Sequence, residues 1–239
     1  MKLLALECSA IPASVAVTDG DKLLAEFYCN IGLTHSQTLM PMVEATFKAT
    51  NLDINDIDGL CISAGPGSFT GVRIGISTLK GLAAPHNKKC VGVSTLEAMA
   101  YGCTSFGGIV AAIMDARCNQ CYCALFLSES NKITRITEDM ALPMSELCDK
   151  IKELNLEYNN PVLAGGDGAA LFINGFGEQL PFARLTSEGC RYQSARFVAA
   201  AAKLKFVNGE TLNHNELQPI YLRLPQAERE FKKKRGEQE

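Results

Sequence analysis

The order of strand and helix patterns along the chain limits the possible folds more than any other feature. The first half opens with three strands, the last two joined by a predicted hairpin turn at Asp19-Gly20-Asp21, and continues with alternating helices and strands. A second series of the same design begins near Gly107. The predicted strands cover residues 2–7, 13–18, 22–28, 59–63, 90–93, 109–114, 122–127, 133–136, 161–165 and 182–186, and predicted helices begin near residues 34, 72, 94, 145, 169 and 194. We therefore predict an α/β protein of two lobes, each a mixed sheet that opens with three antiparallel strands and is flanked by helices.

The predicted lobes divide the chain near its middle. We place the first lobe at residues 1–106 and the second at residues 107–225, with the last helices able to return to the first lobe. Residues 226–239 form a charged tail in which five basic and four acidic side chains nearly cancel. Such a composition is typical of a solvated terminus.

The composition excludes several classes of protein. With 47% hydrophobic and 21% charged residues among 239, the chain is typical of a globular protein and not of a disordered or fibrous one. Its 23 basic and 26 acidic residues give a formal net charge of -3, which argues against nucleic-acid binding by this chain alone. Ten cysteines without a disulfide-framework pattern indicate a reducing cytoplasm. Glu7 interrupts the first apolar run, and no run is long enough to span a membrane.

A glycine-rich segment, Gly65-Pro66-Gly67-Ser68-Phe69-Thr70-Gly71-Val72-Arg73-Ile74-Gly75, lies between a predicted strand and a predicted helix. This location favours anion binding, because free backbone N–H groups and the positive end of the helix dipole meet there. The segment matches neither a Walker loop, nor a dinucleotide fingerprint, nor a nucleophile elbow. The alternative is a tight turn followed by a helix on which Gly71, Gly75 and Gly81 form a flat packing surface. The candidate contacts to a nucleotide or anion are Gly65, Gly67, Ser68, Thr70 and Arg73.

No residue pattern predicts a metal site. The three histidines, His35, His86 and His214, include no pair at the spacing that places two imidazoles on one helix face. Cys118, Cys121 and Cys123 have no fourth ligand at a usual spacing, so we interpret them as a packed or solvent-edge set. Asp115 and Arg117 follow the first strand of the second lobe, where either a functional role or an ordinary ion pair would suit them.

Taken together, the motifs resemble one known family. These motifs are LALECSA with SVAV, then THSQTLMP, AGPGSFTGVRIGISTLKGLA, VSTLEAMA, MDAR and a late PIYLR. They are similar to those of the TsaB (YeaZ) family of tRNA threonylcarbamoyladenosine biosynthesis proteins, and the resemblance covers nearly the whole chain to Arg223. The resemblance implies the actin-like fold shared with Hsp70 and sugar kinases. Its strand and helix order agrees with the order predicted above.

The resemblance also implies a function without catalysis of its own. Members of the family pair with TsaD, a catalytic subunit of similar fold, and with the ATPase TsaE. The complex transfers a threonylcarbamoyl group to the adenosine beside the anticodon of tRNAs that read codons starting with A. The resemblance implies no cofactor held by this chain, ATP or ADP at the partner interface, tRNA contact through the complex, and a homodimer when the chain is alone. The residues it assigns to the partner or dimer interface are His35, Leu39, Met40, Val43, Gly71, Gly75, Thr78 and Leu79.

Two departures from the family pattern bear on nucleotide binding. Glu7-Cys8-Ser9 replaces the usual Asp-Thr or Asp-Ser after the first strand, and the turn from Ser9 to Pro12 contains no glycine to grip a phosphate. Both argue against ATP binding by this chain alone. Asp115-Ala116-Arg117 is followed by Cys118-Asn119-Gln120-Cys121 where the family usually has Arg-Gly-Glu-Val.

Two other classes of function stay open: an enzyme, either a kinase or a peptidase, and a scaffold. A small-molecule kinase of this fold would need an aspartate base and phosphate turns in both lobes, and Gly165-Gly166-Asp167-Gly168 is the one glycine cluster of the second half. A peptidase would need a paired nucleophile and base, which the sequence does not supply. A self-associating scaffold without a role in tRNA modification is the remaining alternative.

Overall fold

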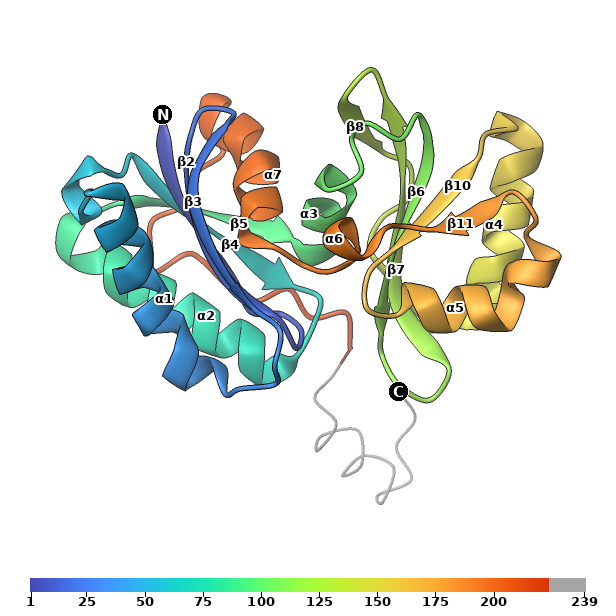
Figure 1. The fold of residues 1–239 in the computed structure, drawn as a ribbon, viewed down its shortest axis with the longest axis horizontal. Coiled ribbons are helices and arrows are strands. Elements are labelled where there is room, and N and C mark those ends of the chain that lie inside the picture. The colour runs from blue at the N-terminus through green and yellow to red at the C-terminus, as the bar shows by residue number, and fades with distance from the viewer. Residues whose placement is uncertain (224–239) are drawn as a thin grey trace.

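The computed structural model describes residues 1–223, which form two lobes side by side (Figure 1). The charged tail predicted at residues 226–239 lies outside the described residues. In the first lobe, the sheet has the strand order β3-β2-β1-β4-β5, in which β1 pairs antiparallel with β2 and parallel with β4. The elements of this half are β1 (Lys2–Glu7), β2 (Ala13–Asp19), β3 (Lys22–Cys29), α1 (His35–Thr50), β4 (Gly59–Gly65), α2 (Phe69–Ala83), β5 (Lys89–Ser94) and α3 (Thr95–Tyr101).

The second lobe repeats this plan. Its sheet has the order β11-β10-β6-β7-β8, with β9 also paired to β7, and it opens with the antiparallel strands β6, β7 and β8. The elements of this half of the chain are β6 (Gly108–Asp115), β7 (Gln120–Glu129), β8 (Lys132–Arg135), β9 (Met140–Pro143), α4 (Met144–Tyr158), β10 (Val162–Gly165), α5 (Ala169–Phe176), β11 (Ala183–Leu185), α6 (Glu188–Arg191) and α7 (Ala195–Val207). The predicted pair of mixed sheets, each opening with three antiparallel strands, is confirmed.

The central strands of each sheet are buried on both faces, because successive side chains point to opposite faces and nearly all of them are apolar. On β1, Leu4 and Leu6 point toward α1 and α2, whereas Leu3 and Ala5 point toward α7. Helix α3 covers the inner face of the second sheet, and α4 and α5 cover its outer face. The layers therefore run from α1 and α2, through the first sheet, through α7 and α3, through the second sheet, to α4 and α5 (Figure 1).

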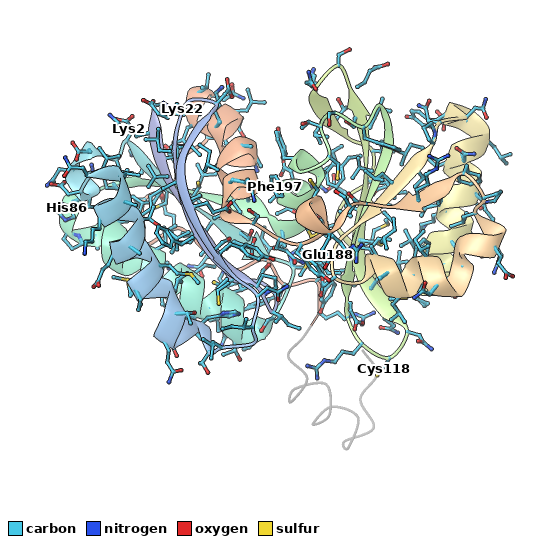
Figure 2. All side chains as sticks on the ribbon, in the orientation of Figure 1. Lys2, Lys22, His86, Cys118, Glu188 and Phe197 are labelled. Carbon is cyan, nitrogen blue, oxygen red and sulfur yellow. The ribbon has the colours of Figure 1, made fainter. Side chains whose placement is uncertain are left out.

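Helix α7 belongs to the first lobe in space although it follows the second lobe in sequence. Its side chains Val198 and Ala202 pack against β1, β2 and β5. Phe197, at the start of α7, lies between the lobes (Figure 2) and fills the space beside Gly102 at the end of α3. After α7 the chain continues along the first lobe, where Leu212 forms an isolated antiparallel bridge with Cys90 and Leu217 is buried in the core.

Local signals in the sequence predict most element positions and miss a few. Helix α2 begins at Phe69, three residues earlier than expected, because Ser68 serves as its N-cap. Helix α1 continues through Pro41 from His35 to Thr50, and the side chain of Thr34 at its N-cap makes no capping hydrogen bond. Strand β9 and helix α6, both of four residues, are absent from the sequence prediction. Among residues 1–223, none of the helices has the length and apolar character needed to cross a bilayer.

Candidate functional site

A cleft of about 680 Å³ separates the lobes on one side of the molecule. The first lobe contributes the turn after β1, the start of α1 and the start of α2, and the second lobe contributes the end of β6 and the turn after β10. The residues that line the cleft are Ser9, Ala10, Ile11, Gly32, Leu33, His35, Pro66, Gly67, Ser68, Phe69, Thr70, Met114, Asp115, Ala116, Arg117, Tyr122, Asp167, Ile220, Tyr221, Leu222 and Arg223.

The glycine-rich turn between β4 and α2 reaches this cleft, and two of its N–H donors are engaged within the first lobe. The Ser68 N–H donates to the Ser9 carbonyl oxygen at 2.6 Å, and the Gly71 N–H donates to Ser68 Oγ at 3.2 Å. A side chain on Gly67 would overlap the backbone of Ser9, so glycine is required for this close approach. These hydrogen bonds favour a packing role for the turn over the predicted anion cradle.

The five predicted anion contacts divide into two groups. Gly67, Ser68 and Thr70 line the cleft. Gly65 instead lies against the Ile220 carbonyl oxygen, and the exposed Arg73 lies over the Phe69 ring with its Cζ 3.8 Å from the ring centroid. Gly65 and Arg73 do not line the cleft, because the C-terminal segment covers Gly65 and Tyr221 of that segment holds Arg73. Their contact with an anion stays a prediction.

Glu7 is the most deeply buried ionisable group beside the cleft. Its side chain is fully buried at the end of β1, and Oε1 accepts hydrogen bonds from Ser9 N and Ser9 Oγ, both at 2.6 Å. Its Oε2 shares a further short hydrogen bond with Ser63 Oγ at the end of β4. Burial raises the pKa of Glu7 above its ordinary value, although the serine hydrogen bonds and the nearby His35 oppose that rise. Glu7 thus ties the first strand to β4 and to the Ser9 turn.

Replacing Glu7 with glutamine is expected to flatten the pH dependence of stability. Because the pKa is raised in the folded state, folded Glu7 retains a proton at pH values where the unfolded chain has released it. The contribution of Glu7 to the free energy of unfolding is therefore fully present below the pKa that Glu7 has in the unfolded chain. It is lost as pH rises toward the pKa that Glu7 has in the folded chain. Urea unfolding midpoints of the wild type and Glu7→Gln, measured between about pH 4.5 and pH 8, should converge toward acid and separate toward base. Parallel curves would show that Glu7 is ionised in both states.

The second lobe presents carboxyl groups to the cleft. Asp167 accepts a hydrogen bond from Gln193 Nε2 at 2.9 Å, and its pKa is raised by burial. Asp115 accepts a hydrogen bond from the Arg117 N–H at 2.7 Å, and its charge adds to the rise in the pKa of Asp167. Side chains on Gly166 or Gly168 would overlap the end of β6, so this glycine cluster forms a tight turn against the sheet.

The outer surface of α1 and α2 does not contain all of the residues predicted for the interface, because several of them face the core. Leu39, Val43 and Leu79 have at most 2% of their surface exposed and belong to the core of the first lobe. A side chain on Gly71 would overlap the Cys8 carbonyl oxygen, and one on Gly75 would overlap Cys8 Sγ. The prediction that these five residues face a partner is therefore wrong, because they bring α2 and α1 close to the sheet.

Three of the predicted interface residues do reach the surface. Met40 is 39% exposed, Thr78 is partly exposed, and His35 is partly buried with its Nε2 donating to the Ala10 carbonyl oxygen at 2.8 Å. Around them, the two helices present mostly small or apolar side chains to solvent, and they lie next to each other on the outer side of the lobe (Figure 1). We call this surface the α1/α2 face and define it by Thr38, Met40, Pro41, Ala45, Ile74, Ser77, Thr78, Gly81 and Leu82.

The predicted cysteine set is divided between solvent and core. Cys118 is exposed in the turn between β6 and β7 (Figure 2), whereas Cys121 and Cys123 are fully buried on β7. Within residues 1–223, no group of three histidine, cysteine or acidic side chains is placed to hold a metal ion.

Sequence reasoning missed the contact between the late PIYLR motif and the glycine-rich segment. Tyr221 stacks on Phe69 with ring centroids 4.8 Å apart, and Arg73 Nε donates to Tyr221 Oη at 2.7 Å. The only signal in the sequence was that both segments belong to the motifs of the resemblance. The contact lies where the cleft meets the α1/α2 face.

Comparison with known proteins agrees with this architecture. YeaZ from Pseudomonas aeruginosa superposes with a TM-score of 0.75 and 24% identity, covering 92% of this chain and 99% of that one. Component A of (R)-2-hydroxyglutaryl-CoA dehydratase from Acidaminococcus fermentans superposes with a TM-score of 0.52 and 11% identity over 87% of this chain and 99% of that one. The chain is thus a two-lobed protein of the predicted actin-like fold, with an interlobe cleft and an outer pair of helices.

The sequence comparisons give the family. Residues 31–226 match the family model described as TsaD: tRNA N6-adenosine threonylcarbamoyltransferase, and the chain belongs to this family. The tRNA threonylcarbamoyladenosine biosynthesis protein TsaB of Bacillus subtilis is 28% identical over 230 residues, or 95% of this chain and 96% of the relative. A tRNA N6-adenosine threonylcarbamoyltransferase of Erythrobacter litoralis is 33% identical over only 63 residues, or 26% of this chain and 18% of the relative. The resemblance to TsaB (YeaZ) proteins is confirmed by the near full-length match.

Proposed function

We propose that this chain is a noncatalytic subunit in the formation of threonylcarbamoyladenosine in tRNA. In this proposal it binds and stabilises a TsaD-type catalytic subunit, which transfers the threonylcarbamoyl group to the adenosine beside the anticodon. A TsaE-type ATPase completes the complex in the cytoplasm, ATP or ADP lies at the partner interface, and tRNA is met through the complex. Without its partner, the chain forms a homodimer.

The observation that carries the proposal is the α1/α2 face. Small and apolar side chains dominate it, and the charged residues on the two helices are only Glu44, Lys48, Arg73 and Lys80. Small side chains allow helices of a partner to approach closely, and depletion of charge is typical of the centre of an interface. The family relation to a transferase supports a partner of similar fold, because like lobes can pair through equivalent surfaces.

The cleft supports the noncatalytic part of the proposal. Ser68 Oγ is engaged as the N-cap of α2, and the described residues show no hydrogen bond from it to a histidine or carboxylate. The backbone donors at Ser9 and Ser68 are engaged with Glu7 and Ser9, and not directed at a ligand. A nucleophile or phosphate site would need these groups to be available.

Reconstitution of tRNA modification tests the proposal. Purified TsaD-type and TsaE-type proteins, threonylcarbamoyl-AMP and tRNA are combined with or without this chain, and the modified nucleoside is measured by mass spectrometry. Modification should require the chain and should be lost, together with complex formation, in Thr78→Glu. Leu204→Glu is the matched control, because it adds the same charge at an exposed apolar site on α7, outside the α1/α2 face.

Three results would contradict the proposal. Equal modification without the chain would remove its role, and modification by the chain alone would make it an enzyme. A homodimer that persists when the catalytic subunit is added would favour the self-associating scaffold.

A further inference from the structure

One side chain near the α1/α2 face is held in a fixed geometry by aromatic contacts. The Arg73 guanidinium lies over Phe69, with its Cζ 3.8 Å from the ring centroid. The same Cζ lies 5.7 Å from the ring centroid of Tyr221. Its Nε donates to Tyr221 Oη at 2.7 Å. Arginine loses less conformational entropy on binding when its planar fork is already oriented, so this stack prepares Arg73 for recognition.

The C-terminal segment of the described chain fixes the stack. Leu217 is buried in the core of the first lobe, and the Ile220 N–H donates to the Ala64 carbonyl oxygen at 2.7 Å. These two contacts anchor the backbone directly before Tyr221. Tyr221 and Phe69 therefore act as positioning residues for Arg73.

The terminal nitrogens of Arg73 have no protein partner in the part of the chain that the structure describes. Arg73 is exposed, and within residues 1–223 it has no ion pair and only the hydrogen bond from Nε. Helices α1 and α2 carry three basic side chains, Lys48, Arg73 and Lys80, and one acidic side chain, Glu44. A surface with this excess of positive charge complements an acidic group on its partner.

We infer that Arg73, beside the α1/α2 face, is the specificity contact for the TsaD-type partner and receives a carboxylate of that partner through its two terminal nitrogens. This inference rests on the proposed function and names the chemistry of its interface. A bidentate pair of this kind is strong and directional, because two parallel charge-assisted hydrogen bonds form at once. Arginine is also enriched among the residues that dominate binding energy at interfaces.

Affinity measurements with the purified TsaD-type subunit test the inference. Arg73→Gln should weaken the complex at least about tenfold, because it removes one partner of a charge pair at the interface. Arg73→Lys should recover only part of this loss, since lysine keeps the charge without the planar fork. Lys48→Gln is the matched control: it removes the same charge from an exposed site on α1 and should weaken binding less than about threefold.

A double-variant cycle tests the positioning role of Tyr221. Tyr221→Phe keeps the ring and removes the hydrogen-bond acceptor, and it should weaken binding less than Arg73→Gln. The double variant should be no weaker than Arg73→Gln alone, because Tyr221 acts through Arg73. Unchanged melting temperatures would show that each variant remains folded.

The outcomes separate the inference from the proposed function. If the wild type does not bind the TsaD-type subunit, the proposed function fails and the inference fails with it. If the wild type binds and Arg73→Gln binds equally well, or loses no more than Lys48→Gln, only the inference is overturned. Loss of tRNA affinity with unchanged partner affinity in Arg73→Gln would assign Arg73 to a phosphate and would also overturn it.

Discussion

Leu39→Glu is expected to unfold the first lobe, whereas Met40→Glu should leave it folded and disrupt only the complex. The two residues are neighbours on α1, yet Leu39 is 1% exposed and Met40 is 39% exposed. Glutamate at position 39 would bury a charge without a partner and remove apolar packing, which should cost about 4 kcal/mol or more of the free energy of unfolding. This is a large part of the roughly 5–15 kcal/mol that stabilises a typical domain.

The same substitution at position 40 should change the free energy of unfolding by no more than about 0.5 kcal/mol, because the new charge is solvated. It should weaken binding of the TsaD-type subunit at least about tenfold, since it places a charge within the apolar α1/α2 face. Urea unfolding followed by circular dichroism and a binding titration would measure both effects. If Met40→Glu binds normally, α1 does not contribute to the interface.

Alanine substitutions at two glycines of α2 are expected to change stability in opposite directions. A Cβ on Gly71 would overlap the Cys8 carbonyl oxygen and lie 3.2 Å from His35 Cδ2, and backbone cannot move aside as a flexible side chain can. Gly71→Ala should therefore reduce the free energy of unfolding by about 2–3 kcal/mol. Gly81 is exposed, and nothing lies within 4 Å of its added Cβ.

Gly81→Ala should raise the free energy of unfolding by about 0.5–1 kcal/mol, because alanine loses less backbone entropy than glycine in a helix. The pair is internally controlled, since both changes are chemically identical and lie in the same helix. Thermal unfolding of the two variants beside the wild type would measure the difference. Stabilisation by both would mean that α2 does not lie against the end of β1.

Most of the fold could be predicted from local patterns. Short apolar runs indicate the central strands of both sheets. Ser94, three residues before Glu97, caps α3 by accepting a hydrogen bond from the Glu97 N–H at 3.3 Å. Strand β9 could not be predicted, because its four residues have no alternation of their own and depend on pairing with β7.

The candidate site could be predicted only in part. Small and apolar residues occur on both sides of α2, so periodicity alone did not show that Gly71, Gly75 and Leu79 face inward. The position of Tyr221 could not be derived either, because its contact with Arg73 spans 148 residues of sequence. Contacts of this range depend on the path of the whole chain and have no local signal.

The return of α7 to the first sheet has a consequence for synthesis on the ribosome. The inner face of β1 and β2, which carries Leu3, Ala5 and Ala16, is covered by Val198, Ala199 and Ala202. The first lobe to emerge is therefore the one that is completed last, and its inner apolar face stays uncovered while the second lobe is being translated. During that interval it is a surface that a chaperone can bind.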